Sequence, residues 1–212
     1  MEKPIGILGG TFDPVHHGHL RLALECLEAA ALTEVALVPL HTPPHRRPPV
    51  ASPEQRREML RLAVEEVRGL ALEDCELQRG GVSYTVDTLA ELRARYGGRP
   101  LCLIMGRDAF ARLDTWHQWP LLLQHAHIIV AQRPGNQAGI ENPEIAAVHA
   151  QAAVRDHREL RTSPSGRILD ISIPMLDISA TRLRQLRADG RSIRFLLPPA
   201  VLAFIEANHL YT

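Results

Sequence analysis

Short apolar runs alternate along the chain with longer segments in which apolar residues recur every three or four positions. The short runs predict buried strands, which we expect at residues 4–8, 35–40, 101–106, 127–132 and 167–174. The periodic segments predict helices at residues 19–31, 54–67, 85–96, 179–190 and 199–207. Alternation of strand and helix is typical of an α/β fold, a doubly wound parallel sheet flanked by helices, here with a small C-terminal helical part.

The chain length favours a single domain that covers residues 1–212. Residues 133–166 are rich in Pro, Gly, Asn, Gln and Ala, and we expect a surface excursion there with one short helix. Residues 175–212 form the predicted C-terminal helical portion. We find no internal repeat and no low-complexity tract in the sequence.

Charge and composition limit which binding partners and which cellular location we expect for the protein. The formal net charge is zero, which argues against a nucleic-acid partner, and the longest pure apolar run is too short to cross a membrane. The three cysteines form no CxxC motif, so we expect a reducing, cytoplasmic location. Lys3 is the only lysine, which excludes a Walker A loop and leaves arginine as the phosphate-binding cation.

Ligands of parallel sheets bind beyond the carboxyl ends of the strands, where this chain carries GGTFDPVHHGHL at residues 9–20. Its glycines allow backbone N–H groups to approach a ligand, and the following helix begins with unpaired donors that suit a phosphate. His16 and His19, three positions apart, can both point at that phosphate, and an imidazole is easily protonated beside an anion near pH 7.

Other interpretations of the same twelve residues stay open at this point. One is a glycine-rich turn with surface histidines, and another is a zinc site formed by His16, His17 and His19. The spacing of the glycines does not match G-x-G-x-x-G, which disfavours a dinucleotide-binding dehydrogenase.

A second candidate anion site lies in ISATRLR, residues 178–184. Ser179 can cap a helix that stops at Gly190, and Thr181 and Arg184 share one face of its first turns. A hydroxyl and a guanidinium at a helix start predict another phosphate seat. The alternative is an ordinary solvated amphipathic helix with surface arginines.

These two motifs carry a resemblance to a known superfamily. HHGH at 16–19 and ISATRLR at 178–184 resemble the two signatures of the nucleotidyltransferases. Nearly the whole chain is similar to the bacterial nicotinate-nucleotide adenylyltransferases, and residues 136–166 are the least similar. The other supporting stretches are VPLHTPPHR (38–46), SYTVDTL (83–89), IMGRDAF (104–110), DTWHQW (114–119) and AQRPG (131–135).

The resemblance implies a Rossmann-like nucleotidyltransferase fold, a reaction and a set of substrates. The family joins nicotinate mononucleotide to ATP, giving nicotinate adenine dinucleotide and pyrophosphate. The attacking phosphate has a second pKa near ~6, so no general base is needed and attack is direct. We expect Mg²⁺ to arrive with ATP, and because no paired carboxylates form a metal cage we name no protein metal ligand. A homo-oligomer stays possible.

The resemblance also assigns residues to roles. The expected catalytic residues are His16, His19 and Arg184. The expected ATP-binding residues are Gly9, Gly10, Thr11, Gly18, Asp108, Ser179 and Thr181. The expected nicotinate mononucleotide-binding residues are His45, Arg46, Ser83, Tyr84, Thr85, Trp116 and His117.

Two positions depart from the family pattern, and several rival functions are open. Ala109 stands where a hydroxyl residue is common, and His117 where an aromatic residue is common. The nearest rivals use the same chemistry on nicotinamide mononucleotide or phosphopantetheine. A non-catalytic nucleotide-binding sensor and a zinc hydrolase are rivals from other classes.

Overall fold

The computed structural model describes residues 2–44, 48–134, 140–174 and 176–212. Seven strands among these residues form one sheet in the order β3-β2-β1-β4-β5-β7-β6. The strands are β1 (Ile5–Gly10), β2 (Glu34–Pro39), β3 (Leu70–Leu72), β4 (Leu101–Gly106), β5 (His127–Gln132), β6 (Ala153–Val154) and β7 (Ile168–Ser172). The pairs whose register is described, β1–β4, β4–β5, β5–β7 and β6–β7, are all parallel. The predicted α/β fold with a parallel sheet is therefore confirmed.

The chain divides into two compact units. The first unit consists of Met1–Leu8, Glu25–Val35 and Tyr84–Pro174, and the second of Gly9–Leu24, Ala36–Ser83 and Met175–Thr212. Strands β1 and β2 contribute residues to both, because the unit boundary falls within each of them.

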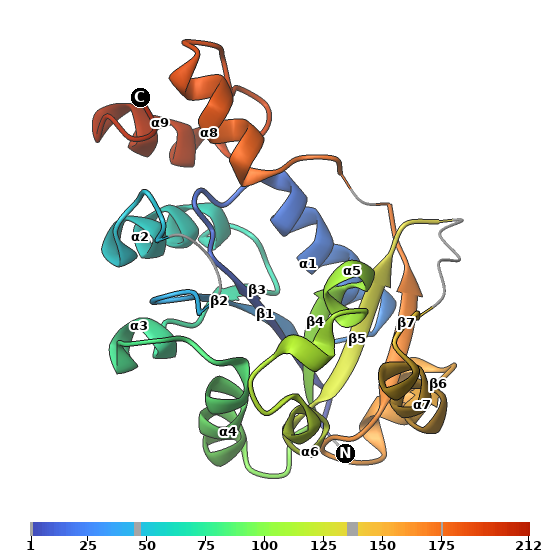
Figure 1. Cartoon of the computed structure of the whole chain (residues 1–212). Coiled ribbons are helices and arrows are strands. Elements are labelled where there is room, and N and C mark those ends of the chain that lie inside the picture. Colours follow the sequence, from blue (N-terminus) through green and yellow to red (C-terminus); the bar gives the residue numbers. More distant parts are fainter. Residues whose placement is uncertain (1, 45–47, 135–139, 175) are drawn as a thin grey trace. The chain divides into compact units, whose positions relative to one another are not determined.

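The first unit is built on β4, β5 and β7, which lie side by side in Figure 1. Their apolar residues are buried along nearly the whole length of each strand, as expected when helices cover both faces of a parallel sheet. Its helices are α4 (Thr85–Tyr96), α5 (Arg107–Phe110), α6 (Leu122–His125) and α7 (Pro143–Ala152), with 3₁₀ turns at Leu113–Thr115, Trp119–Leu121 and His157–Arg161. Within it, α4 packs against α6.

The second unit contains most of the remaining helices. They are α2 (Pro53–Val64), α3 (Cys75–Arg79), α8 (Ala180–Ala188) and α9 (Pro199–Ala207), together with the first part of α1 (His17–Ala29). Ser52 caps α2 through a complete capping box with Gln55, and Pro53 occupies the first turn. Helix α2 packs on both β3 and α9.

The segment 133–166 carries more structure than the predicted surface excursion. Its described part contains α7, the strand β6 that pairs with β7, and a 3₁₀ turn. Ile145 and Leu160 are fully buried, so this part of the segment contributes to the core of the first unit. The predicted short helix is present as α7, whereas the strand and the 3₁₀ turn were not predicted, because a two-residue strand and scattered apolar side chains leave no periodic pattern in a Pro- and Gly-rich stretch.

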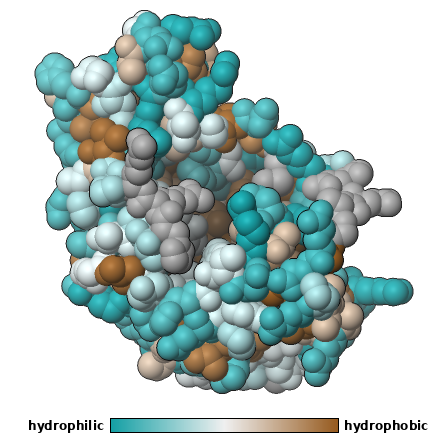
Figure 2. Space-filling view, in the orientation of Figure 1, coloured by the Kyte–Doolittle hydropathy of each residue, from teal (hydrophilic) through white to brown (hydrophobic). Residues whose placement is uncertain are grey.

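The three cysteines are buried and form no disulfide bond. Burial raises the pKa of the Cys26 thiol to about 12, and it raises the pKa of Cys102 further still. Among the described residues, no helix is both long and apolar enough to span a bilayer. Hydrophilic residues predominate on the face shown in Figure 2, where apolar residues form small patches.

Candidate active site

The start of α1 forms the first part of the candidate site. The His16 carbonyl accepts hydrogen bonds from the N–H groups of His19 (2.9 Å) and Leu20 (3.3 Å), so the helix begins at His17, two residues before the predicted start. Its first turn holds no acidic residue. The positive end of the helix is therefore left without a carboxylate to neutralise it.

His16 and His19 stack on each other, with ring centroids 3.8 Å apart and planes inclined by 21°. The Nδ1 atom of each ring is buried and has no hydrogen-bond partner. Burial, together with a smaller effect of a neighbouring histidine, lowers the pKa of His16 to about 4 and that of His19 to about 3. Both imidazoles are therefore neutral at pH 7 in this structure.

The glycines of the 9–20 stretch differ in what they leave room for. A Cβ at Gly9 would meet no atom within 4 Å, so the backbone there is open to a ligand. A Cβ at Gly18 would lie 3.0 Å from the His16 ring, and one at Gly10 would lie 2.9 Å from the Phe12 ring. The space that a side chain would take at Gly10 and Gly18 is thus filled by the protein's own rings.

Helix α8 supplies the second part of the site, as the sequence predicts. The Ser179 hydroxyl accepts from the N–H of Arg182, and Leu183 and Leu186 are buried. Arg184 Nη2 donates to Thr181 Oγ1 at 3.4 Å on the other side of the helix. No acidic residue lies in the first turn of α8 either, whereas α2, α4 and α7 each carry one there.

Two further residues, Asp13 and Arg56, support these elements and were missed from the sequence. Arg184 Nη1 donates to the Asp13 carbonyl at 2.6 Å and lies 3.8 Å from its carboxylate. Arg56 is fully buried and donates to the carbonyls of Thr11, Leu40, His41 and Ala51. A signal for Arg56 was present, because it occupies the apolar face of α2 with Met59, Leu60, Ala63 and Val64.

The first unit holds most of the residues expected to bind the pyridine nucleotide. The rings of Tyr84 and His117 lie 4.3 Å apart and are tilted by 36°, so the structure brings these two together. Thr85 opens α4, and Tyr84 before it makes no side-chain cap to the first turn. Trp116 is half-buried, and His117 is exposed.

Asp108, Ser83, His45 and Arg46 complete the predicted set. Asp108 is exposed in the first unit and folds back over Gly106, where an added Cβ would lie 2.7 Å from its carboxylate oxygen. Ser83 is buried in the second unit, and its hydroxyl already accepts the His41 N–H at 2.9 Å. Ser83 therefore anchors the segment after β2. His45 and Arg46 lie outside the described residues.

Comparison with known proteins gives the family. A model described as cytidylyltransferase-like matches residues 7–186. A protein named probable nicotinate-nucleotide adenylyltransferase from Halorhodospira halophila is 48% identical over 95% of this chain and 93% of that relative. One of the same name from Methylococcus capsulatus is 47% identical over 98% and 99%. The chain belongs to the nicotinate-nucleotide adenylyltransferase family.

The fold agrees with that family. The structure of a Plasmodium falciparum nicotinic acid mononucleotide adenylyltransferase in complex with NaAD is similar, with a TM-score of 0.75, 17% identity and coverage of 99% of this chain and 98% of that one. At this identity the likeness shows the Rossmann-like fold alone. The family resemblance expected from the two signature motifs is confirmed.

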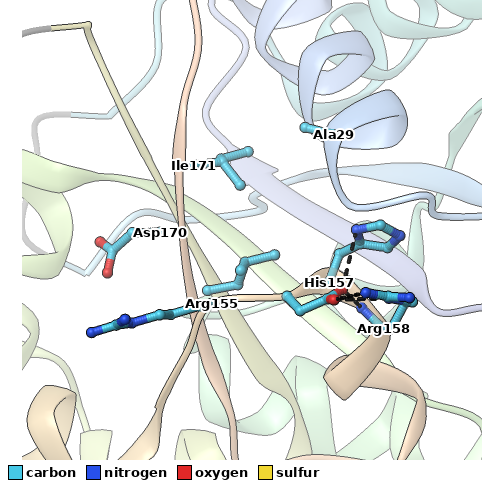
Figure 3. A pocket seen from close by; sticks show the side chains of 8 residues that line it. Ala29, Arg155, His157, Arg158, Asp170 and Ile171 are labelled. Atoms are coloured by element: carbon cyan, nitrogen blue, oxygen red, sulfur yellow. Dashed lines mark hydrogen bonds and ion pairs between the residues drawn. The ribbon is translucent and has the colours of Figure 1, made fainter.

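Two cavities among the described residues of this family member contain no predicted site residue. One, of about 530 Å³, lies in the first unit around Arg155, Asp156, His157 and Arg158. Asp156 pairs with both Arg158 and His157, whereas Arg155 and Asp170 are drawn apart from this cluster in Figure 3. The other, of about 480 Å³, lies in the second unit beside the exposed Phe195.

Among the described residues of this family member, no group of three or more His, Cys, Asp or Glu side chains is arranged to hold a metal ion. The stacked pair His16 and His19 has no third ligand of these types beside it.

Proposed function

We propose that this protein, as one nucleotidyltransferase domain over residues 1–212, transfers the adenylyl group of ATP to nicotinate mononucleotide in NAD biosynthesis. An oxygen of the mononucleotide phosphate attacks the α-phosphorus of ATP, and the bond from that phosphorus to the oxygen bridging the α- and β-phosphates breaks. The products are nicotinate adenine dinucleotide and pyrophosphate. The nucleophile is already ionised at pH 7, so no residue has to remove a proton.

The observation that carries this proposal is the composition of the second unit. It gathers a stacked histidine pair with unpartnered Nδ1 atoms, an arginine with donors to spare, and two helix starts that hold no acidic residue. Such an arrangement suits a polyanion whose charge grows during reaction.

The residues divide the work of charge stabilisation. Gly9, Gly10 and Thr11 provide N–H or hydroxyl contacts to the reacting phosphate, and His16 and His19 contact the phosphates of ATP. The approach of an anion raises the pKa of each imidazole, so the neutral rings can take up a proton as ATP binds. Arg184, with Ser179 and Thr181 beside it, holds the β- and γ-phosphates that leave. These groups stabilise the transition state by position and charge.

Magnesium completes the charge balance on ATP in this proposal. A divalent cation that bridges the phosphates neutralises the negative charge that develops on pyrophosphate as it leaves. The lack of a cluster of three or more potential metal ligands among the described residues supports a cation that enters with the nucleotide. The location of the reaction is taken to be the cytoplasm.

The first unit supplies the specificity for nicotinate in this proposal. The start of α4, at Thr85, has donors that suit the nicotinate carboxylate, and Tyr84 leaves that helix end uncapped. Tyr84, His117 and Trp116 offer faces for stacking on the pyridine ring. Asp108 contacts the ribose of ATP, and His45 and Arg46 act on the mononucleotide phosphate.

The deciding experiment is an assay of the purified full chain with ATP, Mg²⁺ and one mononucleotide at a time. We expect nicotinate adenine dinucleotide and pyrophosphate in equal amounts, formed only when nicotinate mononucleotide is added. Equal kcat/KM for nicotinamide mononucleotide, or a preference for phosphopantetheine, would replace the proposed substrate. No turnover despite ATP binding would indicate a nucleotide sensor, and activity tied to stoichiometric zinc would indicate a hydrolase.

A further inference from the structure

Asp13 is a buried carboxylate at the centre of the second unit, and only 4% of its surface is exposed. Its Oδ2 accepts the N–H of Val50 at 2.8 Å, and its Oδ1 accepts the N–H of Ala51 at 3.1 Å. Oδ1 also accepts the hydroxyl of Tyr211 at 2.7 Å. A carboxylate with three such donors is fixed in position and orientation, because each hydrogen bond restrains a different direction.

Arg184 is held by this same residue. Its Nη1 donates to the Asp13 carbonyl at 2.6 Å and lies 3.8 Å from Oδ2, so both the backbone and the side chain of Asp13 face the guanidinium. Nη2 contacts Thr181, and the arginine side chain keeps about 30% of its surface exposed. One edge of the Arg184 guanidinium is thus hydrogen-bonded to the protein, and its exposed N–H groups can bind an anion.

Tyr211 reaches Asp13 from the segment that follows α9. Its backbone has φ of 61°, a left-handed conformation that a bulky side chain adopts only at a cost, and its side chain is buried. Burial and the neighbouring carboxylate raise the pKa of the phenol well above its usual value, so the hydroxyl stays a donor throughout the physiological pH range. The strained backbone places that donor against Asp13.

We propose that Asp13 is a positioning residue that aims Arg184 at the leaving phosphates, and that the Tyr211 hydroxyl holds Asp13 in the orientation this requires. The inference rests on the proposed function, since it takes Arg184 as the arginine that binds the β- and γ-phosphates. Asp13 and Tyr211 themselves touch no substrate. They act through the direction of one guanidinium.

The test is a double-mutant cycle between Tyr211→Phe and Arg184→Ala in the full chain. Phenylalanine keeps the ring and removes only the hydroxyl. We expect Tyr211→Phe to lower kcat about tenfold and to raise the Kd of Mg·ATP about tenfold, because a hydrogen bond to a charged group is lost. The KM for nicotinate mononucleotide stays within about twofold. In the Arg184→Ala background, Tyr211→Phe then changes neither kcat nor Kd by more than about twofold.

Controls separate positioning from general support of the fold. Tyr96→Phe removes a tyrosine hydroxyl from the first unit and should leave kcat unchanged. If Tyr211 had a merely structural role, Tyr211→Phe would lower Tm by the same number of degrees, and kcat by the same factor, in the wild-type and Arg184→Ala backgrounds. That result would overturn the proposal. If Tyr211→Phe does not fold, Asp13→Asn replaces it in the same cycle, with the same dependence on Arg184 expected.

Binding and turnover together distinguish the inference from the proposed function. Wild-type turnover with no effect of Tyr211→Phe rejects the positioning role and leaves the function intact. ATP binding that shows the Arg184-dependent loss, without turnover on nicotinate mononucleotide, rejects the function and supports the positioning role. A wild-type chain that does not bind Mg·ATP rejects both.

Discussion

In the second unit two polar side chains that support the candidate triphosphate site, Asp13 and Arg56, are buried and bonded to the backbone, whereas in the first unit the rings expected to meet the pyridine nucleotide are half-buried or exposed. Asp13 and Arg56 together engage six backbone N–H and carbonyl groups of their own unit through their side chains. Tyr84 and His117 touch chiefly each other among the described ring contacts.

The difference follows from what each ligand part demands. A phosphate that changes charge during reaction is stabilised best by donors that need no rearrangement, so their positions have to be fixed in advance. A flat ring is recognised by contact area, which side chains can supply after it arrives. The comparison predicts that substitutions in the second unit affect stability and kcat, and that substitutions in the first unit affect mainly KM.

The largest effect is expected from Arg56→Met, which should lower the free energy of unfolding by about 3–5 kcal/mol. The substitution leaves four buried carbonyl groups without their donor. Urea denaturation measures the loss. The neighbouring Arg57→Met is the matched control, because Arg57 is half-exposed and pairs with the carboxylate of Asp74. A similar loss in both variants would contradict the buried role of Arg56.

Removal of one preorganised donor comes next. His19→Ala should lower kcat by about 100- to 1,000-fold, the range observed when a single transition-state donor is deleted. Steady-state assays measure kcat, and His17→Ala serves as control because the His17 ring lines the cavity beside Phe195. A kcat for His19→Ala equal to that of the wild type would remove His19 from the catalytic set.

The free energy of unfolding should also depend on pH in the absence of ligand. The unfolded chain protonates its histidines near pH 6.5, whereas folding lowers the pKa of His16 to about 4 and of His19 to about 3. The unfolded state therefore binds more protons, and the free energy of unfolding falls as pH drops from 6.5 towards 4.

Unfolding at several pH values tests this dependence. The double variant His16→Gln, His19→Gln should show a shallower slope over the same range. His127, whose pKa is also lowered by burial, is present in both proteins and so cancels in the comparison. Identical slopes would show that the stacked pair is not buried as neutral imidazole.

The smallest effect is expected in the first unit. Tyr84→Leu should raise the KM for nicotinate mononucleotide about fivefold, which corresponds to about 1 kcal/mol of lost ring contact. Because the triphosphate site lies in the other unit, kcat and the KM for ATP should stay within about twofold. A large fall in kcat instead would mean that the two units do not divide the work in this way.

Much of this architecture could be predicted from the sequence. Strands 101–106 and 127–132 and helices 85–96 and 199–207 have the predicted bounds, because each is a strongly apolar or strongly periodic stretch. The short elements β3, α3 and β6 were missed, since two to five residues carry no period. Helix α1 begins two residues before its predicted start. The backbone carbonyl of His16, and not a capping side chain, accepts the first hydrogen bonds of this helix.

The candidate site divides in the same way. His16, His19 and Arg184 stand within recognisable motifs, and the structure brings both histidines together and gathers all three in one unit. Asp13 and Tyr211 are 198 positions apart, so no local pattern could join them. The neutral state of the histidines also required the fold, because it arises from burial that only tertiary packing creates.

The buried thiols allow the opening of each unit to be measured separately. Cys26 and Cys102 belong to the first unit and Cys75 to the second, and all three are shielded from solvent. An alkylating reagent attacks a thiolate that it can reach, so labelling has to await a local or global opening event. The rate of modification of each cysteine, measured by mass spectrometry, therefore reports the rate at which its own unit opens. No engineered probe is needed.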